Sequence, residues 1–187
     1  MSDSIPPLEM EELDEELRAT LQPRVTRLKY LGEFFKLAGH VPKALLGFIQ
    51  FTEEAKSLLD KKTTEIIALT VASMKGNEYE RNQHERLSVK LGYGSDWVTQ
   101  VEALAPDEAS LLSDDERNLQ RFVIAKVESD GRDETTSIYE LAARVGAEQA
   151  IAILMVMGRY TTHALLVNTL KLAPPVPSIF EDGFTGK

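Results

Sequence analysis

The fold of this chain follows from the stretch Asp60-Lys-Lys-Thr-Thr-Glu-Ile-Ile-Ala-Leu-Thr-Val-Ala-Ser-Met-Lys-Gly76, which continues as Asn77-Glu-Tyr-Glu-Arg-Asn-Gln-His84. Asp60 can cap a helix that ends near Lys75, because a glycine at position 76 readily takes the left-handed conformation that stops a helix. Asn77 can then cap a second helix over 78–91, which Gly92 closes. The short turn between them predicts a helical hairpin.

The first helix of this hairpin is apolar on nearly every side. Its run from Ile66 to Met74 contains no charged residue, so this helix is predicted to be buried all round. On the second helix, the face predicted to point inward carries Glu80, His84, Leu87 and Leu91. The opposite face, predicted to meet solvent, carries Glu78, Asn82, Glu85, Arg86 and Lys90.

Helical signals extend over much of the remaining chain. A proline at a first helical turn, a Ser113-Asp-Asp-Glu116 capping box and glycine stops predict further helices at 42–59, 113–128, 134–145 and 147–172. No segment shows convincing strand alternation. The sequence therefore predicts an all-α, single-domain helical bundle. Gly92 and Gly146 close corresponding helices in its two halves, as a duplicated helical hairpin would.

Composition divides the chain into three parts. Residues 1–22 are rich in acidic side chains and are predicted to form a solvated arm or helix. Residues 23–172 form the predicted helical domain. Residues 173–187 begin with Ala-Pro-Pro-Val-Pro-Ser, which cannot continue a helix, so an extended tail is predicted there.

Composition also narrows the function. The chain has 187 residues, no cysteine and a formal net charge of −9 at pH 7. The absence of cysteine excludes disulfides, thiolate metal sites and cysteine nucleophiles, and it suits the reducing cytoplasm where we expect the protein. The negative charge argues against nucleic acid as a partner. The N-terminus lacks signal-peptide features and the longest uncharged apolar runs are shorter than the ~20 residues that span a bilayer, so no membrane partner is expected.

Glu65, Glu80 and His84 are the strongest candidates for chemistry. Glu65 shares a face with Leu69 and Ala72, and a carboxylate buried in this way needs a hydrogen-bond or charge partner. The hairpin brings Glu80 and His84 against it, and two carboxylates with an imidazole in apolar surroundings can form an acid–base site. The same trio can equally be a structural hydrogen-bond cluster.

The spacing of these residues resembles the core of the carboxymuconolactone decarboxylase and alkyl hydroperoxidase D superfamily. The peroxidase branch of that superfamily has a glutamate followed by Cys-x-x-Cys-x-x-x-His. Glu65 and His84 match the glutamate and the histidine, while Asn77 and Glu80 stand where the two cysteines would be. The piece from Tyr79 to His84 is the most specific part of a likeness that covers roughly residues 20–172.

The resemblance implies an alkyl hydroperoxidase D-like helical fold with chemistry that needs no cysteine. A thiol–disulfide peroxidase reaction is impossible without sulfur, so peroxiredoxin activity is not expected. The decarboxylase branch implies a general acid–base enzyme of the lyase type, without a cofactor, that acts on a small carbonyl, lactone or carboxylic acid. The family also implies a symmetric homo-oligomer (dimer, trimer or hexamer). The extended character of the tail, with Phe180 and Phe184 predicted to be exposed, indicates that it braces a neighbouring subunit.

The last predicted helix offers further residues for a pocket. Tyr160 and His163 are three residues apart and share a face, although a buried tyrosine is as readily a structural group. Arg159 can hold a substrate carboxylate. With Asn77 and Tyr79 of the motif, these three residues are assigned to substrate binding.

In the leading hypothesis, His84 transfers a proton while Glu80 or Glu65 orients it or acts as the second acid or base. Two alternatives stay open. Glu65, Glu80, His84 and His163 offer oxygen and nitrogen ligands to a metal ion. The helical core can also be a non-catalytic oligomeric module that binds a ligand.

Overall fold

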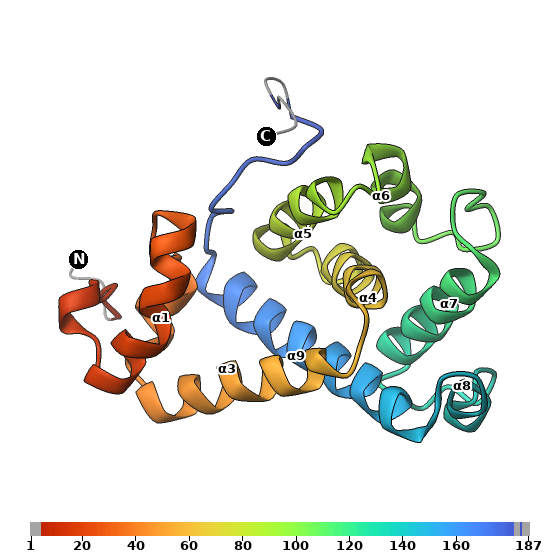
Figure 1. The fold of residues 1–187 in the computed structure, drawn as a ribbon, viewed down its shortest axis with the longest axis horizontal. Helices are drawn as coiled ribbons and strands as arrows, with labels where there is room; N and C mark the ends of the chain where they lie inside the picture. The colour runs from red at the N-terminus through yellow and green to blue at the C-terminus, as the bar shows by residue number, and fades with distance from the viewer. Residues whose placement is uncertain (1–4, 182–183, 185–187) are drawn as a thin grey trace. The chain divides into compact units, whose positions relative to one another are not determined.

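The computed structural model describes residues 5–181 and 184, and within these residues it contains helices and turns but no strand. The predicted all-α fold is therefore confirmed. A short 3-10 helix spans Met10–Glu12. The α-helices after it (Figure 1) are α1 Glu15–Leu28, α2 Glu33–Ala38, α3 Pro42–Ser57, α4 Lys61–Met74, α5 Glu78–Lys90, α6 Ser95–Glu102, α7 Asp114–Glu128, α8 Ile138–Val145 and α9 Ala147–Leu170.

The chain forms two compact units, residues 1–53 and 54–187. Helix α1 runs through residue 22, the predicted boundary between the acidic arm or helix and the helical domain. Asp14 caps α1 by accepting hydrogen bonds from two backbone N–H groups, and Leu17 and Leu21 bury one side of the helix. The acidic residues at the start of α1 therefore belong to a capped, half-buried helix.

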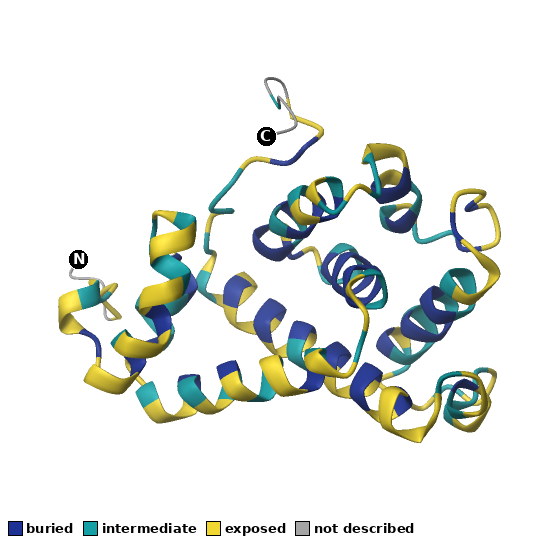
Figure 2. Cartoon of the chain, viewed as in Figure 1, coloured by how far each residue is buried: buried dark blue, intermediate teal, exposed yellow. Residues whose placement is uncertain are grey.

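Helix α4 is the centre of the second unit. Every residue from Thr64 to Ala72 is buried, which confirms the prediction that this helix is enclosed on all sides. It packs against α5, α6, α7 and α9. Figure 2 shows α4 coloured as buried along most of its length, whereas the helices around it are buried on one side only.

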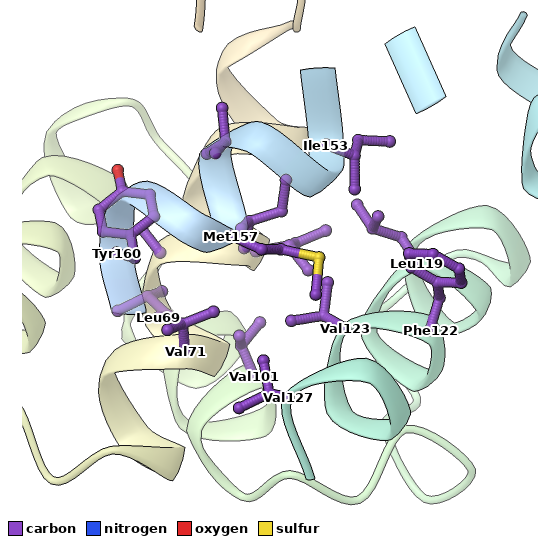
Figure 3. Packing of buried hydrophobic residues seen from close by; sticks show 14 of the residues in the cluster. Leu69, Val71, Val101, Leu119, Phe122, Val123, Val127, Ile153, Met157 and Tyr160 are labelled. Carbon is purple, nitrogen blue, oxygen red and sulfur yellow. The ribbon is translucent and has the colours of Figure 1, made fainter. Parts of the chain in front are cut away.

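The hydrophobic core around α4 draws side chains from several helices (Figure 3). Leu69 of α4 belongs to one buried cluster with Val101 of α6, Val123 of α7 and Met157 of α9. Burying a side chain of this size contributes roughly 1.5–3 kcal/mol. Packing of this kind explains α6, which the sequence did not predict: it has eight residues and no capping side chain, yet Trp97 is 3% exposed.

The capping signals located three helices correctly. Asp60, Asn77 and Ser113 each accept a hydrogen bond from a backbone N–H in the first turn of α4, α5 and α7. These side chains compete with water for donors that have no partner within the helix. The helix starts are therefore encoded locally.

The helix predicted at 134–145 begins four residues later, at Ile138. The carboxylate of Asp133 accepts hydrogen bonds from the backbone N–H and hydroxyl groups of both Thr135 and Thr136. These bonds hold the segment in a turn, and Ser137 then caps α8. Local side-chain bonds of aspartate thus outweighed the helical tendency of the segment.

Replacing Ser113 by Ala is expected to lower the free energy of unfolding by about 1 kcal/mol, because Ser113 and Glu116 form a capping box that satisfies two backbone donors of α7. Chemical denaturation measures the change. Ser95→Ala, at an exposed position without a capping bond, is the control and should change stability by less than about 0.5 kcal/mol. Equal stability of the two variants would contradict the prediction.

Helix α9 is the longest helix and one of the most apolar. By length and composition, α9 could cross a membrane. An 18-residue stretch of it has a mean hydropathy of 1.5, but half of that stretch is buried inside the protein. A core helix of a globular protein has the same character. The remaining side of α9 exposes the apolar side chains Ile151, Leu154, Met155, Leu165 and Leu166.

The outer face of α5 differs from the prediction. Asn82 and Glu85, predicted to meet solvent, are 3% and 0% exposed, whereas Leu87, predicted to point inward, is 39% exposed. The tail, which lies along α5 of its own chain, buries Asn82 and Glu85: the Asn82 amide donates to the carbonyl of Val176 at 3.0 Å, and the Ser178 hydroxyl donates to Glu85 at 2.5 Å. Helical periodicity cannot predict this contact, because the tail and α5 are far apart in the sequence.

Candidate acid–base site

Helices of the second unit bring the candidate residues into one cluster. They are Lys56 at the end of α3, Glu65 of α4, Asn77, Glu80 and His84 at the start of α5 and within it, and Arg159, Tyr160 and His163 of α9. All are buried except Lys56 and Arg159, which are partly exposed. Figure 3 shows the hydroxyl of Tyr160 pointing away from the apolar side chains of the core.

Glu65 and His84 form the inner pair. Oε2 of Glu65 lies 2.7 Å from Nδ1 of His84 and 3.4 Å from the hydroxyl of Ser88. Because an ionised carboxylate only accepts hydrogen bonds, Nδ1 of His84 carries a proton. The other ring nitrogen, Nε2, lies 3.2 Å from the hydroxyl of Tyr160 and 3.6 Å from Oε1 of Glu80. The imidazole is thus held between two carboxylates, with Nε2 facing a phenol.

Glu80 is the second buried carboxylate, and the guanidinium of Arg159 pairs with it directly. Its other oxygen lies 3.5 Å from Nε2 of His163. Asn77 fixes the orientation of that ring: its carbonyl oxygen accepts from the backbone N–H of Glu80, so its amide nitrogen faces Nδ1 of His163 at 3.2 Å. Nδ1 then accepts, and Nε2 carries the proton that points toward Glu80.

The surroundings separate the two histidines. Burial alone would lower the pKa of His84, but the charge and hydrogen bond of Glu65, together with Glu80, outweigh burial and raise the pKa above its ordinary value. Burial lowers the pKa of His163 to about 4, against the attraction of Glu80. Near neutral pH, His84 therefore keeps its second proton better than a free histidine does, whereas His163 is neutral.

The carboxylate and the phenol are shifted in opposite directions. Burial alone would raise the pKa of Glu80, but the positive charges of Arg159 and His84 hold it well below its usual value. Burial raises the pKa of Tyr160 well above its usual value, and Glu80 and Glu65 add to that increase. The site therefore combines an ionised carboxylate with two proton donors, the imidazolium of His84 and the phenol of Tyr160.

The two histidine rings should titrate at different pH. His84 is expected to deprotonate above pH 6.5 and His163 to protonate only near pH 4, which NMR of the ring nitrogens measures, with His84→Gln to assign the signals. The raised pKa of His84 stabilises the fold below pH 6.5, and this stabilisation is lost as the pH rises and His84 deprotonates. The lowered pKa of His163 stabilises the fold above pH 6.5, and this stabilisation is lost as the pH falls toward 4. The free energy of unfolding should therefore fall on both sides of near-neutral pH. A common midpoint for both rings would contradict this assignment.

Every residue assigned from the sequence lies in or against this cluster. The ring of Tyr79 lies 5.7 Å from that of His163, and Arg159, expected to hold a substrate anion, pairs with Glu80 of its own chain. Lys56 was not predicted from the sequence; its ammonium lies 3.3 Å from the hydroxyl of Tyr160 and 5.8 Å from the centre of its ring. Lys56 and Tyr160 are 104 residues apart, so only the fold brings them together.

The arrangement does not resemble a metal centre. Among residues 5–181 and 184, no group of three or more His, Asp or Glu side chains is placed to hold a metal ion. Glu65 and Glu80 instead bind the cationic and hydrogen-bonding groups described above.

A cavity of about 340 Å³ lies elsewhere in the unit, where Lys62, Leu119 and Arg144 help to line it, and no residue of the cluster contributes to that lining.

This chain is similar to known proteins at the level of structure. Neither a family model nor a curated protein matches the sequence. A cysteine-to-alanine variant of the debrominase Bmp8 in complex with 2,3,4-tribromopyrrole matches with a TM-score of 0.77 and 15% identity over 92% of each chain. The alkylhydroperoxidase AhpD core of an uncharacterized peroxidase-related protein from Ralstonia eutropha JMP134 matches with a TM-score of 0.75 and 18% identity, over 96% of this chain and 92% of the other. At such identities the likeness establishes the fold.

Proposed function

We propose that this protein, which has the alkyl hydroperoxidase D-like fold, is a general acid–base enzyme that acts on a small carbonyl, lactone or carboxylic acid. The observation that carries the proposal is the arrangement of His84: Glu65 holds one ring nitrogen, and the other faces Glu80 and the hydroxyl of Tyr160. A protonated imidazole that is oriented in this way is prepared to deliver a proton.

The residues divide the work as follows. Glu65 fixes the ring of His84 and raises its pKa, so that it remains an acid near neutral pH. Tyr160 lies between His84 and the partly exposed Lys56, whose ammonium donates to the Tyr160 hydroxyl, so a proton can pass inward along this line and restore His84 after His84 has given up its own. Arg159 keeps Glu80 ionised, which in turn holds the positive charge of His84 in place.

A decarboxylation uses these groups without any cofactor. The bond between the carboxylate and its neighbouring carbon breaks, carbon dioxide leaves, and the electron pair passes into the adjacent carbonyl as an enolate. The acid then gives one proton to the carbon, and solvent restores the acid. Such a proton transfer by a positioned side chain typically contributes ~10²–10⁴-fold in rate.

The structural neighbours are compatible with a small substrate. The debrominase structure contains 2,3,4-tribromopyrrole, a small ring, so this fold can hold a ligand of that size in that protein. The present chain has no cysteine, so a thiol cannot supply electrons to a substrate. We therefore favour proton transfer over reduction.

To test this proposal, the purified full-length chain is incubated with a set of small β-keto acids and lactone acids in D₂O. Proton NMR follows the loss of the starting acid and the entry of deuterium at the carbon next to the carbonyl. We expect rates above those of buffer and of the Glu65→Gln variant, which retains the shape of Glu65 without its charge. Equal rates with and without wild-type protein, for every compound, would refute the proposal.

The burial of the cluster favours a second candidate, a non-catalytic protein in which these groups form a polar core. Glu65 is 2% exposed and His84 7% exposed. If the cluster is structural, Glu65→Gln and His84→Gln should both lower the melting temperature strongly. If it is catalytic, their melting temperatures should be unchanged or raised, because functional groups are often held at a cost in stability.

We also propose that the protein is a homo-oligomer, in line with the family that it resembles. The exposed apolar side of α9, with Ile151, Leu154 and Leu165, is the kind of surface that a symmetric contact would cover. Light scattering of the purified chain, with a Leu165→Lys variant for comparison, measures the assembly. A monomeric wild-type protein would contradict it.

A further inference from the structure

The C-terminal segment, residues 174–181, is fastened to α5 by polar contacts at successive positions. The amide of Asn82 donates to the carbonyl of Val176 at 3.0 Å, and Nε of Arg86 donates to the carbonyl of Pro177 at 2.8 Å. These contacts use backbone carbonyls that an extended, proline-rich segment cannot satisfy internally. The attachment therefore depends on groups supplied by α5.

Glu85 is the anchor of the attachment. Its side chain is 0% exposed, and its Oε2 accepts from the hydroxyl of Ser178 at 2.5 Å and from the backbone N–H of Ile179 at 2.8 Å. Its other oxygen lies 3.3 Å from Nε of Arg81. A fully buried carboxylate that receives two donors from one segment ties the position of that segment to its own charge.

A second carboxyl group faces Glu85 from α6. Burial, and after it the negative charge of Glu85, raise the pKa of Glu102 to about 7, although Arg81 acts in the opposite direction. One oxygen of Glu85 and one of Glu102 are buried without a hydrogen-bond partner among the described residues. Two acceptors can lie together in this way when a proton on one of them is donated to the other.

We propose that this carboxyl pair is a proton-operated latch for the C-terminal segment. With its proton in place, Glu102 can donate to Glu85, and the single negative charge of Glu85 holds Ser178 and Ile179. Without that proton, two carboxylates face each other beside one cation, Arg81. Their repulsion is relieved when the segment leaves and water reaches Glu85.

The remaining charged groups near the pair are already engaged. On α5, Arg86 binds the carbonyl of Pro177; on α4, which packs against both α5 and α6, Glu65 binds His84; and Glu181 accepts from the backbone N–H of Ser178. Arg81 is the positive group that acts on Glu102, so the loss of the proton from Glu102 leaves two carboxylates beside that cation. The latch concerns the tail and does not rest on the proposed enzymatic function.

The direction of the effect follows from proton linkage. In the attached state the buried charge of Glu85 helps to raise the pKa of Glu102 to about 7. Once the segment leaves and water reaches Glu85, that charge acts less strongly, and Glu102 binds its proton less tightly. Attachment is therefore strongest at low pH and is progressively lost as the pH rises toward and through about 7. One linked proton changes the attachment equilibrium by up to about tenfold per pH unit.

Hydrogen exchange of the Ile179 amide, which donates to Glu85, tests the latch in the full-length chain between pH 5 and pH 8.5. At each pH the wild type is compared with Glu102→Gln, so that the intrinsic pH dependence of exchange cancels. The glutamine is a permanent, uncharged donor, and we expect its protection to exceed that of the wild type increasingly toward pH 8. Glu108→Gln, which removes a charge at an exposed position in the loop after α6, should follow the wild type.

Identical protection of wild type and Glu102→Gln at every pH would overturn the proposal. Ser178→Ala, which removes one of the two donors to Glu85, should show low protection across the whole range; full protection in that variant would also overturn it. Should Glu102→Gln fail to fold, carbon-13 NMR of the wild type decides, because the carboxyl of Glu102 and the amide of Ile179 must then titrate with one midpoint near pH 7. Two separate midpoints would exclude the latch.

Discussion

Replacing His84 by Gln should lower the rate of the proton-transfer reaction by ~10²–10⁴-fold and leave the fold intact. Glutamine can still donate a hydrogen bond to Glu65, which lies 2.7 Å from Nδ1 of His84 in the wild type. Glutamine cannot take up and release a proton, so it cannot act as an acid on the side that faces Tyr160. The measurement is the rate of deuterium entry or carbon dioxide release with the best substrate found, together with circular dichroism to confirm the helical content.

His40→Gln is the matched control for this variant. His40 lies in the first unit, its exposed ring contacts the carbonyl of Pro6 at 2.7 Å, and it has no role in the chemistry proposed for the second unit. Its rate should equal that of the wild type. If His84→Gln retains the wild-type rate, His84 takes no part in proton transfer, and Tyr160 would have to be the acid.

Replacing Arg159 by Met should lower the free energy of unfolding by about 3–5 kcal/mol. The reason is that Glu80, 5% exposed and paired directly with Arg159, would remain buried without its main counter-charge. The pKa of Glu80 would then rise, so part of the loss should be recovered at low pH. Denaturation by urea at pH 7 and pH 5 measures both effects.

Arg144→Met is the control for this substitution, since Arg144 is largely exposed and lies 3.9 Å from an exposed Asp115. It should change stability by less than about 0.5 kcal/mol. The double variant Arg159→Met/Glu80→Gln should be more stable than Arg159→Met alone, because the unpaired charge is gone. Additive losses in the double variant would show that the pair is not coupled.

The helices around the candidate site were predictable because their signals are local. Asp60, Asn77 and Ser113 cap helices within three residues of their own positions, and an uncharged run from Ile66 to Met74 has to be buried wherever the chain folds. The likeness of the motif to a known family then placed Glu65 and His84 together, and the structure shows their side chains in contact.

The exceptions depend on contacts between distant segments. Helical periodicity assigned Glu85 to solvent because it treats α5 as facing a single partner, but the C-terminal segment, more than 90 residues later, covers that side. Lys56 was not predicted for a similar reason, since it lies 104 residues from Tyr160 in the sequence and contacts it only in the folded second unit. The burial of a charged residue on a polar helix face can be predicted from sequence only when the segment that covers this face is already known.

The amino-acid sequence was sufficient for the all-α class, the central apolar helix, the absence of thiol groups and the residues of the cluster around Glu65 and His84 other than Lys56. Capping, periodicity and composition act over a few residues, so they can be interpreted without coordinates. The fold settled the pairing of Arg159 with Glu80, the contrast between the two histidines and the attachment of the tail to Glu85. Burial and the distances between charges control these properties, and both arise only when the chain has folded.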